Sequence, residues 1–109
     1  LNLTIMMNKI KVYTLKGCDK CTSFKKALTK KGLIYKEISC ETNPTECDKI
    51  ESITNTESYP MSIIERLDGV KVLYVAEKYT NMGERQIESG TTAIGVYSID
   101  NMLDLINKD

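Results

Sequence analysis

The sequence predicts an α/β domain in which a mixed four-stranded sheet is flanked by three helices, in the order β-α-β-α-β-β-α. One observation behind this prediction is the strand-helix-strand succession over residues 9–39, which is typical of two parallel strands joined by a helical crossover. Another is Asp68-Gly69 between two apolar runs, the pattern of a tight antiparallel hairpin. The length of 109 residues suits one compact domain.

The first half of the chain contains two strands and two helices. Residues 9–15 are rich in β-branched and aromatic side chains and predict a strand, as do residues 33–39. Between them, apolar side chains recur at helical spacing until Gly32 ends the run. These side chains are Cys21, Phe24, Ala27 and Leu28. Asn43-Pro44 opens a second helix, with Cys47, Ile50 and Ile53 on one face.

The second half predicts a hairpin and a terminal helix. Residues 61–67 and 70–75 form the two strands of the hairpin. Residues 76–93 are polar and are interpreted as an insertion, with a short strand or turn near Gln86-Ile87. The terminal helix carries Ile99, Met102, Leu103 and Ile106, with Ser98 or Asp100 as its cap. We expect residues 1–8 to be an extension or vector-derived, with Met6 or Met7 as the start, and residues 9–109 to form the domain.

Composition excludes several classes of function. Fifteen basic and fifteen acidic side chains cancel, so no net charge attracts nucleic acid or anionic lipid. No apolar run approaches the roughly 18 residues of a membrane span. Histidine is absent, which excludes Cys–His catalysis and histidine-ligated zinc. The four cysteines follow no secretion signal, and we therefore expect a cytoplasmic thiol protein.

The motif Cys18-Asp19-Lys20-Cys21 stands where the first strand turns into the first helix. Two thiols at this spacing can close a small disulfide ring. The unpaired N–H groups and positive dipole end of a helix N-terminus favour a thiolate at the first cysteine. Lys16 and Lys20 add to this effect and Asp19 opposes it. The motif therefore predicts dithiol redox chemistry at Cys18 and Cys21.

This motif, the order of elements and Ser58-Tyr59-Pro60 before a hairpin resemble the glutaredoxin family, which has a thioredoxin-like fold. The resemblance covers about residues 9–108, apart from the insertion. It implies that Cys18 is the nucleophile and that Cys21 is the resolving cysteine. In that family the proline is cis and the backbone of the preceding residue pairs with the cysteinyl part of glutathione. Pro60 is accordingly expected to be cis, against an ordinary trans turn proline, and Tyr59 to dock the substrate.

The resemblance also implies the remaining glutathione contacts. The family's Gly-Gly-x-Ser/Asp-Asp signature falls on residues 95–99, where a helix N-terminus and an acidic side chain hold the γ-glutamyl end. It points to Ser98, Ile99 and Asp100. Ile99 occupies the aspartate position and Asp100 follows it, while Val96 replaces the second glycine. The lysine before the first cysteine is displaced by one residue to Lys16, which either binds a glutathione carboxylate or is a solvated surface lysine.

Two interpretations compete for the other cysteines. Cys18 and Cys21 could be half of a zinc or iron–sulfur site completed by Cys40 and Cys47, but the spacing of the latter two is unusual for zinc. We favour redox chemistry over metal, and we interpret Cys40 and Cys47 as ordinary buried or partly exposed thiols. Cys40 is also a candidate for a secondary redox or glutathionylation site.

We therefore expect a monomeric, glutathione-dependent thiol–disulfide oxidoreductase with no bound cofactor and no metal. Its partners would be glutathione, as co-substrate, and proteins that contain disulfides. One alternative is a thioredoxin-like protein reductant recharged by a flavoprotein reductase. Another is a non-catalytic binding module of the same fold, because an inserted loop can create a specific protein surface.

Overall fold

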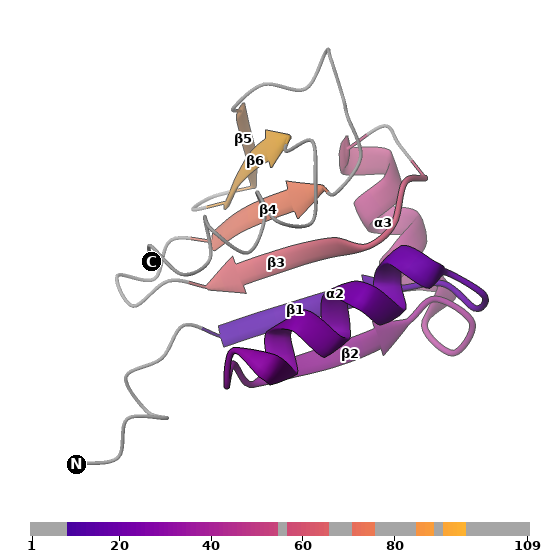
Figure 1. Ribbon diagram of the computed structural model, residues 1–109. Helices are drawn as coiled ribbons and strands as arrows, with labels where there is room; N and C mark the ends of the chain where they lie inside the picture. Colours follow the sequence, from indigo (N-terminus) through magenta and orange to yellow (C-terminus); the bar gives the residue numbers. More distant parts are fainter. Residues whose placement is uncertain (1–8, 55–56, 66–70, 76–84, 89–90, 96–109) are drawn as a thin grey trace.

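The computed structural model describes residues 9–54, 57–65, 71–75, 85–88 and 91–95 (Figure 1). Its strands and helices form one six-stranded sheet with two helices, and the strand order is β2-β1-β3-β4-β6-β5. The strands are β1 Lys9–Thr14, β2 Tyr35–Ser39, β3 Met61–Glu65, β4 Lys71–Val75, β5 Arg85–Glu88 and β6 Thr91–Gly95. The helices are α2 Asp19–Lys30 and α3 Pro44–Thr54.

The first four strands confirm the predicted mixed arrangement. Strand β2 runs parallel to β1, with Thr14 opposite Ser39 at the ends of the two strands. Strand β3 is antiparallel to β1, and β4 is antiparallel to β3, as the hairpin pattern predicts. The strand-helix-strand unit and the hairpin therefore meet along β1 and β3.

The sheet is wider than the four strands predicted: β5 lies within the segment 76–93 interpreted as an insertion, and β6 begins there and continues to Gly95. Strand β5 includes Gln86 and Ile87, where a short strand or turn was expected. Strand β6 was not predicted: it runs parallel to β4, and β5 pairs antiparallel to it with a register shift between Gln86 and Glu88. Alternating side chains do not reveal β6, since its pairing depends on how the chain returns to β4.

Residues alternate along the strands, so each helix covers its own face of the sheet (Figure 1). The α2 face holds the buried residues Ile10, Val12, Phe24, Leu28, Ile64, Val72 and Tyr74. The second cluster packs around α3 and holds Tyr13, Cys21, Ile38, Cys47, Ile50, Tyr59, Met61, Leu73 and Val75. Cys21 belongs to this second cluster although it lies on α2.

Local sequence sets the ends of both helices. Helix α2 ends before Gly32, whose positive φ of 74° suits glycine, and the Leu33 N–H donates to the Leu28 carbonyl at 3.0 Å. Helix α3 begins at Pro44, which has no N–H to leave unpaired in the first turn. The Asn43 carbonyl accepts the Cys47 N–H at 3.2 Å.

Several predicted features lie outside the described residues. They are the extension over residues 1–8, the Asp68-Gly69 turn and the terminal helix around Ile99 and Ile106, so two of the three predicted helices are described. Within the described segments, neither helix has the length and apolar character needed to cross a membrane.

One edge of the sheet gathers the chain segments that matter for the site. Met61 lies opposite Tyr13 in β1 and opposite Val75 in β4, and Val75 lies opposite Gly95 in β6. The ends of β1, β2, β4 and β6 and the start of β3 therefore share this edge. The CxxC motif and Tyr59-Pro60 are placed here by the topology.

Candidate functional site

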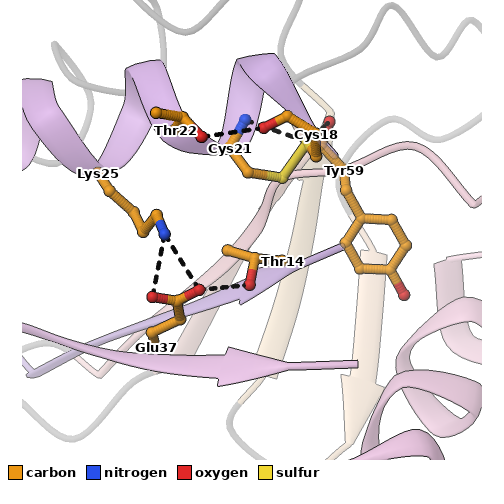
Figure 2. The surroundings of a disulfide bond; sticks show 7 residues. All are labelled: Thr14, Cys18, Cys21, Thr22, Lys25, Glu37 and Tyr59. Carbon is orange, nitrogen blue, oxygen red and sulfur yellow. Dashed lines mark hydrogen bonds and ion pairs between the residues drawn. A yellow bond between two sulfur atoms is a disulfide. The ribbon is translucent and has the colours of Figure 1, made fainter. Parts of the chain in front are cut away.

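The paired sulfurs of Cys18 and Cys21 form a disulfide at the first turn of α2 (Figure 2). Their Cα atoms are 5.2 Å apart, within the usual range for a disulfide. Gly17, just before the pair, has a positive φ of 72° and thereby turns the chain from β1 into the helix. The expected juxtaposition of the two thiols is confirmed.

Cys18 is the N-cap of α2. Its sulfur accepts a hydrogen bond from the Cys21 N–H at 3.1 Å, and its carbonyl accepts the Thr22 N–H at 3.1 Å. A serine or aspartate oxygen usually takes this capping position. In the reduced protein the same N–H would point at the Cys18 thiolate, and hydrogen bonding to the charged form stabilises it.

The two sulfurs differ in access. Cys18 is partly buried, whereas Cys21 is 2% exposed and packs in the cluster around α3. Cys18 is therefore the more accessible residue of the pair.

Tyr59 faces this pair from across the site. Its peptide bond to Pro60 is cis, as expected. The Tyr59 carbonyl oxygen lies 3.9 Å from Cys18 Sγ, so the backbone of Tyr59 borders the partly buried cysteine of the pair. The ring points away from the sulfurs (Figure 2), and its hydroxyl donates a hydrogen bond to Glu51 Oε2 at 2.6 Å. Burial raises the pKa of the Tyr59 phenol, and the hydrogen bond to Glu51 raises it further.

A hollow of about 260 Å³ adjoins Cys18 on the side of β2. Charged side chains of both signs line it: Lys16, Asp19, Lys25, Glu37 and Glu41. Glu37 accepts a hydrogen bond from the Thr14 hydroxyl at 2.7 Å and pairs with Lys25 at 3.1 Å (Figure 2). The Thr14 hydrogen bond, together with Lys25, lowers the pKa of the Glu37 carboxyl. Exposed Lys16 is thus placed beside Cys18, which permits the carboxylate contact that the resemblance implies.

Cys40 and Cys47 correct the sequence interpretation, because they are not free thiols but form a second disulfide. Their Cα atoms are 5.6 Å apart. Cys40 follows β2 directly and Cys47 lies in the first part of α3, so the turn over residues 41–43 brings them together. The placement of one cysteine after a strand and the other on a helix face was visible in the sequence. The path of the turn between them was not.

The four cysteines therefore form two disulfides. Within the described segments, no three histidine, cysteine, aspartate or glutamate side chains are arranged to hold a metal ion. The disulfides use the sulfurs that a zinc or iron–sulfur site would need as thiolates. Of the expected substrate contacts, Ser98, Ile99 and Asp100 lie outside the described residues.

Comparison with known proteins agrees with this site. Among curated proteins no sequence matches the chain at a significant level. The family model of glutaredoxin matches residues 10–66, more than half of the chain. The match extends from β1 through β3 and includes both cysteine pairs and Tyr59-Pro60. The chain therefore belongs to the glutaredoxin family.

Proposed function

We propose that the protein is a thiol–disulfide oxidoreductase that reduces protein disulfides or glutathione mixed disulfides, with glutathione as its electron donor. The observation that carries this proposal is the pairing of a partly buried Cys18 at a helix N-cap with a buried Cys21. A thiolate held by the helix N-terminus attacks faster than an ordinary thiol at neutral pH. Buried Cys21 then limits the lifetime of any mixed disulfide on Cys18 by attacking it.

The cycle transfers two electrons. The Cys18 thiolate attacks one sulfur of the substrate disulfide, forming a mixed disulfide and releasing the other sulfur as a thiolate, which takes a proton from water. The Cys21 thiol loses its proton and attacks Cys18 Sγ, which releases the second substrate thiol and leaves the Cys18–Cys21 disulfide. Two glutathione molecules restore the dithiol and become oxidised glutathione.

Substrate docking is assigned to the two surfaces that border Cys18. The Tyr59 backbone lies 3.9 Å from the sulfur, close enough to align a cysteinyl segment beside it. The hollow on the other side offers Lys16 to a carboxylate. Glutathione carries a carboxylate at each end and a cysteine in the middle, so it suits a site of this kind.

A coupled assay tests the proposal. We expect NADPH-dependent turnover of a glutathionylated peptide in the presence of glutathione and glutathione reductase, and its loss in Cys18→Ser. Cys40→Ser/Cys47→Ser is the matched control for removal of cysteines outside the motif, and it should retain turnover at saturating peptide. Turnover with thioredoxin reductase alone would favour the thioredoxin-like alternative. Folded protein without turnover in either system would leave the non-catalytic alternative.

A further inference from the structure

The second disulfide repeats the arrangement of the first. Cys40 is partly buried, like Cys18, and Cys47 is 2% exposed, like Cys21. Both pairs pack against the cluster around α3, and both lie at the edge of the sheet where β1 and β2 end. In each disulfide, therefore, one cysteine is partly exposed and the other is buried.

The second disulfide also contacts the strand that leads to the first. The Cys40 N–H donates to the Thr14 carbonyl at 2.9 Å, which extends the β1–β2 pairing by one residue. Thr14 ends β1. The only residues between it and Cys18 are the exposed Leu15, Lys16 and Gly17. A shift at Cys40 would therefore reach the loop that carries the nucleophile.

A second connection runs through α3. Cys47 and Glu51 are one turn apart on this helix and so lie on the same side of it. Glu51 accepts the hydrogen bond from the Tyr59 hydroxyl at 2.6 Å, and the Tyr59 carbonyl lies 3.9 Å from Cys18 Sγ. Because Tyr59 is 5% exposed, its ring has little room to move independently of the helix. The disulfide, the helix and the docking backbone thus form one chain of contacts.

We propose that Cys40–Cys47 is a second redox site, opened at Cys40 by low-molecular-weight thiols, and that opening it weakens substrate docking at Tyr59. The docking half of this proposal rests on the proposed function; the redox half does not. Among the exposed charged residues next to the pair in the sequence, Glu41, Glu46 and Asp48 outnumber Lys49, so the local net charge is negative. They disfavour a thiol compound that carries a carboxylate, so the favoured reactant is one without other charged groups, such as 2-mercaptoethanol.

The step balances as an ordinary exchange. The thiol loses its proton to water, and the resulting thiolate attacks Cys40 Sγ, forms a mixed disulfide and expels the Cys47 thiolate, which takes up a proton. The first part of α3 favours this leaving thiolate through the positive end of the helix dipole. A second thiol molecule attacks the mixed disulfide, leaves the Cys40 thiol and yields the oxidised small disulfide. The protein gains two electrons and two protons.

The redox half is tested in Cys18→Ser/Cys21→Ser, which keeps only the second pair. The oxidised variant is treated with 2-mercaptoethanol, quenched with acid, alkylated and analysed by tandem mass spectrometry, while far-UV circular dichroism checks that it stays folded. We expect the adduct on Cys40, with Cys47 alkylated. A disulfide that opens only when the protein unfolds, or an adduct on Cys47, would overturn the assignment. Should this variant fail to fold, the same mapping on the wild-type protein decides, because the two pairs lie in different peptides.

The docking half is tested by kinetics on proteins with an intact Cys18–Cys21 motif. We expect Cys40→Ser/Cys47→Ser to raise KM for a glutathionylated peptide several-fold while kcat stays within about twofold. Glu51→Ala should raise KM similarly, and combining it with Cys40→Ser/Cys47→Ser should add little more. An unchanged KM, or effects that simply add, would overturn the coupling. If the wild-type protein turns over no disulfide, the proposed function fails, and the mass-spectrometric result on Cys40 still stands independently.

Discussion

The Tyr59 hydroxyl donates a hydrogen bond of 2.6 Å to the Glu51 carboxylate, so helix α3 holds the residue whose carbonyl borders Cys18. The backbone and the side chain of Tyr59 thus have different roles. The backbone of Tyr59 faces the reactive sulfur, and its side chain fixes that backbone from behind. The backbone beside Cys18 is therefore held by α3, which covers the opposite face of the sheet from α2.

The first prediction concerns this hydrogen bond. Tyr59→Phe removes the hydroxyl while keeping the buried ring, and leaves Glu51 without this partner. We expect the free energy of unfolding to fall by about 1.5 kcal/mol, the lower part of the range for hydrogen bonds to charged groups. Urea unfolding measures the change, and Tyr35→Phe, in a partly buried tyrosine of β2, is the matched control. Equal stability of Tyr59→Phe and the wild-type protein would contradict the role assigned to the bond.

The same phenol predicts a loss of stability at alkaline pH. Its pKa in the folded protein is raised above the ordinary value of 10.0, so above about pH 10 the unfolded chain loses a proton that the folded chain keeps. Stability should therefore fall as pH rises from about 10, and the fall should be shallower in Tyr59→Phe. Unfolding curves at a series of alkaline pH values measure both slopes. Identical slopes for the two proteins would show that Tyr59 is not the responsible group.

Glu37 predicts the opposite dependence in acid. Its pKa is lowered in the folded protein, chiefly by the Thr14 hydroxyl, so its contribution is present above the ordinary value of 4.5 and is lost as pH falls through the lowered one. The side chain of Glu37 is 38% exposed, and solvent screening limits the contribution to about 0.5 kcal/mol. Thr14→Val should reduce the difference in stability between pH 7 and pH 3. A difference as large as that of the wild-type protein would refute this assignment.

Asp19 predicts an increase in reactivity. It stands in the first turn of α2, directly after Cys18, where its negative charge opposes a thiolate. We expect Asp19→Asn to raise the rate of Cys18 alkylation by iodoacetamide at pH 7 about twofold, more at low salt than at high salt. Glu41→Gln, which removes a charge from another residue that lines the hollow, is the control for a general change in net charge. A slower rate in Asp19→Asn would contradict the electrostatic account.

The sequence predicts the elements whose signals are local. Residues 9–39 show the strand and helix periods clearly, so the position of the CxxC motif at the start of a helix was predicted correctly. The position of Tyr59-Pro60 before a strand was predicted from the hairpin pattern that follows it. The convergence of the motif and Tyr59-Pro60 follows from the topology: β1 of the parallel pair lies antiparallel to β3 of the hairpin, so the end of β1 at Thr14 and the start of β3 at Met61 share one edge.

The features that were missed depend on contacts between elements. Cys40 and Cys47 pair because the turn before Pro44 folds back on Ser39, where the Asn43 side chain donates to the Ser39 carbonyl at 3.1 Å. No repeating pattern of apolar residues predicts this turn. Strand β6 is similar, since a parallel partner for β4 depends on the crossover that delivers it. The hydrogen bond from Tyr59 to Glu51 likewise joins a helix to the loop that follows it.

The central claim is that Cys18 is the attacking sulfur, and competitive alkylation tests it most directly. Fully reduced protein is treated at pH 7 with iodoacetamide at less than one equivalent, and the modified cysteine is identified by peptide mapping. We predict that the label falls on Cys18 well before Cys21, Cys40 or Cys47, and that disulfide reduction is lost in proportion to it. A label that falls first on another cysteine, or full activity after Cys18 is blocked, would contradict the account.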